Sequence, residues 1–263
     1  MLRRICEHVS TLPTGSAAAG LPSSFKKLYI TAPKVCAWHD EPMPECEDDG
    51  VVVKTTVTCM SIGTELRCYR GIPTDPVDAG GEGKYLHEWV PFQFPYENGY
   101  STAGRVVVSG PNSGFRVGDR VVLGTAHAEY TSSPASGVWR IPGEVTDEQA
   151  CWVFIMGVGE LALRRANPKF GSTVGIVGLG MVGLSTLAYC KTYGFKSVAI
   201  DPDPDRRAMA VKLGADIVLS PDQPDFEAQV VQFCAPVGEA PVANDLAAGN
   251  LRDGSVPLCG ARG

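Results

Sequence analysis

The stretch from Thr173 to Asp201 constrains the fold of this chain more than any other part of the sequence. It opens with Thr173 to Val177, a short apolar run rich in β-branched residues, which predicts a buried strand. Gly178, Gly180 and Gly183 follow as G-x-G-x-x-G, and the apolar residues after them recur at helical spacing. A helix N-terminus binds a pyrophosphate well, and residues without a Cβ atom let the pyrophosphate approach the backbone closely. The stretch therefore predicts a dinucleotide-binding turn between a strand and a helix.

The second strand of this stretch, Ser197 to Ile200, ends in an acidic residue. Asp201 lies near the roughly 20-residue offset at which a carboxylate accepts hydrogen bonds from the adenosine ribose. That position favours NAD, because a 2′-phosphate would be repelled, but Arg206 and Arg207 just beyond it are able to hold such a phosphate. NAD is therefore the favoured cofactor, and NADP stays open. The residues expected to bind it are Gly178, Leu179, Gly180, Met181, Val182, Gly183, Asp201 and Arg206.

The same pattern then repeats along the chain. Arg206 to Leu213 predicts a helix that stops at Gly214, and Asp216 to Ser220 predicts a third strand. This β-α-β-α-β order is half of a doubly wound, or Rossmann, α/β sheet. Asp225 to Phe233 predicts a further helix and Gly254 to Cys259 a late strand, with no clear strand between them. The sheet is therefore expected to be shortened, and its unpaired edge favours a homo-oligomer.

Composition narrows the class of protein. The chain has 263 residues, a net charge of −6 and a pI near 5.3, which argues against a nucleic-acid binder or a binder of acidic membranes. No apolar run approaches the length needed to span a bilayer. The nine cysteines show no C-x-x-C spacing, so we expect reduced thiols in a cytoplasmic protein. Residues 1–24 are expected to be a disordered extension, although Arg3, Arg4 and few acids also suit an organellar transit segment.

Residues 25–150 have a different sequence pattern. Short strand-like runs are separated by clusters of Pro, Gly, Asp and Asn, which predicts a barrel-like or sandwich domain. The strands are expected at Leu28–Thr31, Val35–Trp38, Val51–Thr58, Gly104–Ser109 and Arg120–Leu123. The segment from Gly71 to Gly99 gives no clear conformation. Thr146 and Gln149 form a capping box that opens a helix running to about Ala166, and we expect the domain boundary near residue 150.

This order of domains resembles the medium-chain dehydrogenase/reductase superfamily, the alcohol dehydrogenase-like proteins. Four stretches carry the resemblance: SIGTELRCYRG at 61–71, GYSTAGRVVVSG at 99–110, FRVGDRVV at 115–122, and the nucleotide segment from 173 to about 220. The resemblance implies a GroES-like β-barrel domain at 25–150 followed by an incomplete Rossmann domain at 151–263. It also implies hydride transfer between a nicotinamide cofactor and a small-molecule substrate.

The zinc ligands of that superfamily are missing from the matching positions. In zinc-containing members a cysteine precedes a G-T-D-like triplet, and here Ile62 precedes Gly63-Thr64-Glu65. Tyr100 stands where a G-H-E triplet would place its histidine. Zinc needs three or more converging N, S or O ligands, so we expect no catalytic zinc and a member of the branch that lacks the zinc ligands. A rearranged site built from the pair His87 and Glu88 with Cys59 and Cys68 is the alternative.

Without a Lewis acid, hydrogen-bond donors must polarise the substrate oxygen. Thr64 matches a family position that relays a proton, and Tyr100 would place a phenol near the same oxygen. Glu65 is expected to orient its neighbours, and His127, in GTAHAEY, is a further candidate for the site because an imidazole can both donate and accept a proton. Each has a structural alternative: Thr64 capping a turn, Tyr100 packing in the barrel, His127 donating a structural hydrogen bond.

The sequence therefore predicts a zinc-independent, NAD(P)-dependent oxidoreductase acting on an alcohol/carbonyl pair or an activated C=C bond. The alternative is a catalytically impaired dinucleotide-binding protein that serves as a partner subunit or redox sensor. Turnover of any aldehyde, ketone or enone separates the two.

Overall fold

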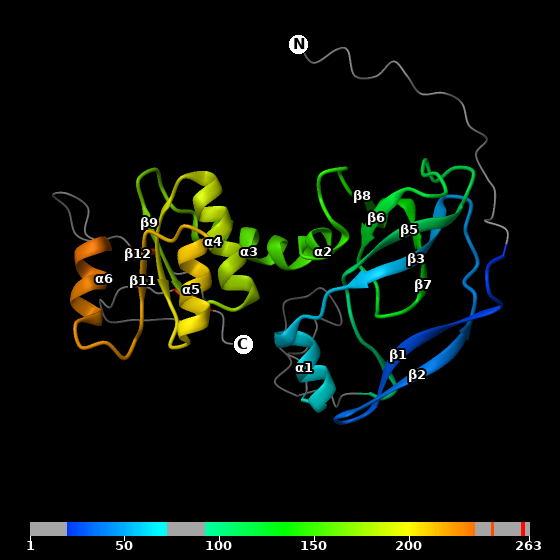
Figure 1. Ribbon diagram of the computed structural model, residues 1–263, viewed down its shortest axis with the longest axis horizontal. Helices are drawn as coiled ribbons and strands as arrows, with labels where there is room; N and C mark the ends of the chain where they lie inside the picture. The colour runs from blue at the N-terminus through cyan, green and yellow to red at the C-terminus, as the bar shows by residue number, and fades with distance from the viewer. Residues whose placement is uncertain (1–19, 73–92, 235–242, 245–258, 261–263) are drawn as a thin grey trace, which may run out of the picture. The chain divides into compact units, whose positions relative to one another are not determined.

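The computed structural model describes residues 20–72, 93–234, 243–244 and 259–260 (Figure 1). The chain divides into two compact units, Met1–Trp152 and Val153–Gly263. Most of the expected N-terminal extension, and the larger part of the segment from Gly71 to Gly99, lie outside the described residues. None of the helices in the described part of the chain is long and apolar enough to cross a membrane.

The first unit is built from two antiparallel sheets. A three-stranded sheet has the order β2-β1-β4, and a five-stranded sheet has the order β7-β3-β5-β6-β8. Buried valines of β3 and β5 pack with Val121, Leu123 and Phe115 to form its main core. The strands are β1 (Ser24–Ala32), β2 (Val35–Pro42), β3 (Gly50–Thr58), β4 (Tyr96–Glu97), β5 (Thr102–Ser109), β6 (Arg120–Leu123), β7 (Tyr130–Pro134) and β8 (Val138–Arg140), with a 3-10 turn, η1, at Ala135–Gly137.

Strand β1 begins earlier than the strand predicted from Leu28. Lys26 and Lys27 interrupt the apolar run there and hide the strand from a pattern search. In the fold, each lysine reaches across to a neighbouring strand: Lys26 pairs with Asp40 on β2 and Lys27 with Glu97 on β4. Cross-strand ion pairs of this kind suit exposed positions of a sheet.

The helix predicted from Thr146 to about Ala166 is in fact two helices, α2 (Asp147–Ala150) and α3 (Val153–Ala166). The capping box is confirmed: Thr146 accepts from the Gln149 backbone and Gln149 reaches back to Thr146. The single helix is wrong: α2 ends at its C-cap, Cys151, and α3 begins at Val153. The Cys151 carbonyl accepts a hydrogen bond from the Ser101 side chain.

The second unit is a parallel sheet with helices packed on both faces. The order β11-β10-β9-β12 is that of a doubly wound fold. Ile176 and Ala199 pack with α3 and α4 on one face, whereas Val198 and Ile200 pack with α6 on the other, as alternation along a strand requires. The elements are β9 (Thr173–Val177), α4 (Met181–Tyr193), β10 (Lys196–Ile200), α5 (Pro204–Lys212), β11 (Ile217–Leu219) and α6 (Phe226–Cys234).

Two short segments pair with the remaining edge of β9. β12 (Ala243–Asn244) pairs beside Thr173, and β13 (Cys259–Gly260) pairs beside Ile176. The prediction that no strand lies between α6 and Gly254 is therefore wrong, because a two-residue strand is too short to show alternation. Of the strand predicted at Gly254–Cys259, the structure describes Cys259 alone. The fold class, a GroES-like β domain plus a Rossmann-like domain, is confirmed.

Candidate functional site

The three glycines after β9 have three different surroundings. Gly178 has a left-handed φ of +87°, which lets the chain turn sharply out of the strand. At Gly183 an added Cβ would overlap the carbonyl oxygen of Gly178, so this glycine lets α4 lie close against the end of β9. At Gly180 an added Cβ would meet nothing within 4 Å, so open space adjoins the turn. These are the roles that a dinucleotide-binding turn assigns to its three glycines.

The N-terminus of α4 is suited to an anion. Its N-cap is Gly180, and no side chain caps it. The first helical hydrogen bond runs from the Leu184 N–H to the Gly180 carbonyl, which leaves the N–H groups of Met181, Val182 and Gly183 ahead of the helical ladder. Unpaired N–H groups and the positive end of the helix dipole attract negative charge. Leu179, in contrast, has its side chain buried in the core.

Asp201 is bound to the glycine turn itself. Its carboxylate is 1% exposed and accepts hydrogen bonds from the N–H of Leu179 at 2.7 Å and of Asp203 at 2.8 Å. Arg206 lies 3.5 Å from the same carboxylate. Burial alone would raise the pKa of Asp201, but these two hydrogen bonds and the charge of Arg206 outweigh it and hold the pKa below its usual value. Arg207 instead donates to the backbone carbonyls of Asp201 and Pro202.

In the first unit, Glu65 is the centre of a buried polar network. It lies on α1 (Ile62–Arg70) and is 2% exposed. Its Oε1 accepts from the Ser61 backbone N–H at 2.8 Å, and its Oε2 accepts from Asn98 Nδ2 at 3.2 Å. The Nε2 of His127 lies 2.7 Å from Oε2, within hydrogen-bonding distance. Three separate segments thus meet at one carboxylate.

Tyr100 lies beside this network. Burial raises the pKa of its phenol, the charges of Glu65 and Cys59 add to the rise, and hydrogen bonding to Ser61 and Thr64 partly offsets it. The structure therefore brings Tyr100, Thr64, Glu65 and His127 into one neighbourhood. Thr64 is exposed on α1, whereas His127 is buried.

Ser61 and Asn98 are members of this network that the sequence patterns did not indicate. Ser61 directly precedes α1 and uses its backbone N–H, not its side chain, toward Glu65. A Ser at a helix start with an acid in the following turn resembles a capping box, but the acid here comes one residue later than in that motif. Asn98 had no comparable signal, because its partner is 33 residues away.

The metal candidates do not converge in the described part of the chain. Ile62, at the position of the family cysteine, is 64% exposed. No group of three or more His, Cys, Asp or Glu that could hold a metal occurs among the described residues, and His87 and Glu88 lie outside them. Burial raises the pKa of the Cys59 and Cys68 thiols, which favours their protonated forms.

Known proteins with related sequences are dehydrogenases. L-threonine 3-dehydrogenase of Pyrococcus horikoshii is 28% identical over 228 residues, which cover 74% of this chain and 60% of that enzyme. An alcohol dehydrogenase of Mycobacterium tuberculosis named as zinc-binding is 30% identical over 210 residues, 66% of this chain and 50% of that protein. No protein-family model matches the chain.

Solved structures share the fold. An alcohol dehydrogenase of Escherichia coli in complex with NADH superposes with a TM-score of 0.66 at 20% identity, covering 84% of this chain and 69% of that one. The chain spans between 28% and 66% of the length of the curated relatives it matches. These proteins are dehydrogenases of the medium-chain dehydrogenase/reductase superfamily. The chain is related in sequence to the curated dehydrogenases and shares the fold of the solved structures.

Proposed function

We propose that this protein is an NAD(P)-dependent oxidoreductase that acts without a zinc ion. One observation carries the proposal: the turn from Gly178 to Gly183, with its open space at Gly180, its uncapped helix end and Asp201 bound behind it. The related dehydrogenases, and the NADH complex of a protein with the same fold, support it. The reaction is hydride transfer between the nicotinamide and an alcohol/carbonyl pair or an activated C=C bond.

The second unit supplies the cofactor site. The first-turn N–H groups of α4 would bind the pyrophosphate, and Asp201 would accept hydrogen bonds from the ribose hydroxyls. Both Asp201 oxygens already accept one N–H each, and a carboxylate oxygen has a second lone pair for a ribose hydroxyl. The lowered pKa of Asp201 keeps it ionised at neutral pH, which favours NAD over NADP. Arg206, paired with this carboxylate, is the group that would contact a 2′-phosphate.

The first unit supplies the groups that would polarise the substrate. When bound, the nicotinamide supplies or accepts the hydride. Tyr100, whose raised pKa keeps its phenol protonated at neutral pH, is the donor to the substrate oxygen, and Thr64 hydrogen-bonds beside it. Glu65 and His127 hold the surrounding segments in place through buried contacts. Ile62 offers no ligand atom to zinc.

The test is a titration of the purified protein with NADH and with NADPH, followed by nicotinamide fluorescence and accompanied by metal analysis. Tighter saturable binding of NADH by metal-free protein is the expected result. A panel of aldehydes, ketones and enones then tests turnover. Cofactor binding without turnover across that panel would favour the alternative, a catalytically impaired dinucleotide-binding partner or redox sensor. If neither cofactor binds, both the oxidoreductase function and the dinucleotide-binding alternative are ruled out.

The expected partners are the cofactor, a small-molecule substrate and a second copy of the chain. The net charge of −6 supports this set of partners, because it disfavours binding to nucleic acid or to acidic membranes. Sedimentation at several protein concentrations measures the oligomeric state.

A further inference from the structure

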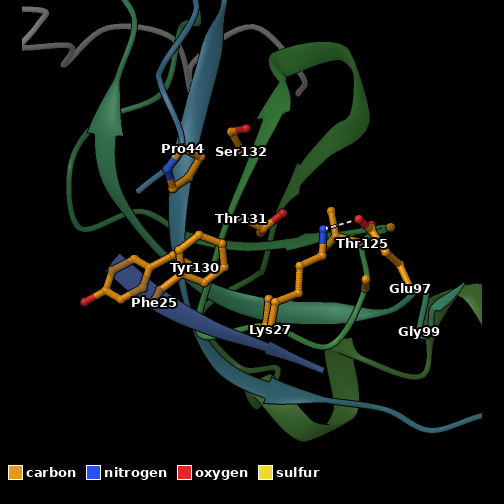
Figure 2. A pocket seen from close by; sticks show the side chains of 12 residues that line it. Phe25, Lys27, Pro44, Glu97, Gly99, Thr125, Tyr130, Thr131 and Ser132 are labelled. Atoms are coloured by element: carbon orange, nitrogen blue, oxygen red, sulfur yellow. Dashed lines mark ion pairs between the residues drawn. The ribbon is translucent and has the colours of Figure 1, made fainter. Parts of the chain in front are cut away.

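A pocket of about 450 Å³ lies in the first unit, outside the set of proposed catalytic residues (Figure 2). Strands β1 and β7 and the segment joining β6 to β7 form most of its wall, and Pro44, Glu97 and Gly99 complete it. None of Thr64, Glu65 or Tyr100 lines it. Its volume falls within the range of roughly 300 to 1,000 Å³ that is typical of small-molecule sites.

The lining combines an aromatic part with a polar part. Phe25 and Tyr130 are arranged edge to face, with ring centroids 6.2 Å apart. Lys27 extends toward Glu97, and its ammonium lies 2.7 Å from that carboxylate (Figure 2). The hydroxyl-bearing side chains of Thr125, Thr131 and Ser132 also line the pocket. The Oγ1 atom of Thr125 is buried and has no hydrogen-bond partner within the described residues.

These groups select the chemical class of an occupant. Lys27 and Glu97 neutralise each other, so an anion would have to displace Glu97 and a cation would have to displace Lys27. A fully apolar molecule would take water away from the ion pair and the hydroxyls and offer them no hydrogen bond in return. A neutral ring carrying several hydroxyl groups meets neither penalty: its C–H groups contact the parts of Phe25, Tyr130 and Pro44 that line the pocket, and its hydroxyls bond to the charged and hydroxyl groups. We infer that this pocket binds a small neutral cyclic polyol, such as a monosaccharide or a cyclitol.

The pocket shares part of its wall with the Glu65 network. Gly99 lines the pocket and lies between Asn98 and Tyr100 in the chain. A Cβ added at Gly99 would lie 3.0 Å from the His127 ring, so its backbone packs directly on that ring. Ala126 and Ala128, on either side of His127, also line the pocket. An occupant therefore contacts the segments that carry Tyr100 and His127, and its binding is coupled to their arrangement.

The test is an amide NMR titration of the isotope-labelled full chain with myo-inositol and glucose, and with gluconate and glucosamine as charged counterparts. The expected result is saturable shifts of the Gly99, Gly124, Ala126 and Ala128 amides with the neutral polyols and weaker effects with the charged ones. Replacing Lys27 with Met keeps most of the stem and removes the charge. It should weaken binding about tenfold or more, as expected for the loss of a hydrogen bond to a charged donor.

A matched pair of surface variants locates the site. Ser132 is exposed and lines the pocket, whereas Ser136 is exposed on η1 and does not. Ser132→Trp should abolish the shifts, and Ser136→Trp should leave them unchanged. Four outcomes would each overturn the inference. In the first two, neither polyol gives saturable shifts, or both tryptophan variants lose them equally. Gluconate or glucosamine binding more tightly than the neutral polyols, or shifts confined to Gly178–Gly183, would also overturn it. NADH binding to the second unit is measured separately on the same variants, so the inference and the proposed oxidoreductase function fail independently.

Discussion

Substituting alanine for Gly183 tests how the glycine turn is built. An added Cβ would overlap the Gly178 oxygen and lie 3.0 Å from its carbonyl carbon and 3.4 Å from Cγ2 of Ile176. The first two atoms belong to the backbone, so no side-chain rotation relieves the overlap and α4 must move away from β9. Overpacking of this kind costs roughly 1 to 3 kcal/mol, and we expect the upper end because the backbone has to shift. Alanine regains at most about 1 kcal/mol in helix propensity. The net loss is therefore about 2 kcal/mol.

Gly180→Ala is the matched control. Nothing lies within 4 Å of its added Cβ, and its φ of −75° is one that alanine adopts. Its folding free energy should change by no more than about 0.5 kcal/mol, as for other substitutions at open positions. Its methyl group nevertheless enters the space through which a pyrophosphate would approach. NADH should therefore bind at least about tenfold more weakly, a change of ~1.4 kcal/mol.

Urea unfolding followed by circular dichroism gives the stability of both variants, and NADH fluorescence gives their affinities. Wild-type affinity in Gly180→Ala would show that the pyrophosphate does not lie on this turn. Wild-type stability in Gly183→Ala would show that α4 and β9 are not packed as closely as described. The two results are independent, so each refutes one step of the reasoning.

Three further predictions concern the carboxylates and the phenol. Asp201→Asn removes a carboxyl whose pKa is lowered in the folded protein. The wild type should therefore lose stability as the pH falls below about 4, and the variant should lose less. Thermal unfolding measured at several pH values tests this. Glu65→Gln removes a charge that raises the pKa of Tyr100, so the pKa of Tyr100 should fall. NMR of the tyrosine ring carbons measures this pKa, and Tyr100→Phe identifies the Tyr100 signal. An unchanged pKa would contradict the prediction. Tyr100→Phe should lower kcat about 10²-fold or more with folding intact, measured on any substrate found in the panel.

Much of the second unit was predictable because its contacts are local in sequence. Strand β10 follows the turn within one helix, and Gly194 ends α4 with a left-handed φ of +76°, as its place after the helical run predicted. The Asp201 carboxylate reaches Leu179 across 22 residues. Regular spacing within one βαβ unit therefore contains most of the information that fixes the cofactor turn.

The first unit was less predictable for the opposite reason. The motifs indicated Glu65 and His127 separately, but the pair they form spans 62 residues. The Cys151 carbonyl, between α2 and α3, accepts a hydrogen bond from Ser101, which lies 50 residues earlier. Contacts between distant segments leave no periodic signal, and a single sequence contains no other record of them.

Glu65 and Asp201 have the same physical role in the two units. Each is a carboxylate at most 2% exposed, and such a burial is stable only when hydrogen bonds or an opposite charge compensate it. For Asp201 the compensating groups are two backbone N–H groups and Arg206; for Glu65 they are the Ser61 N–H, Asn98 and His127. Because all the donors must be in place at once, each carboxylate fixes the segments that carry them. The glycine turn and the surroundings of Tyr100 are therefore each ordered by a buried carboxylate.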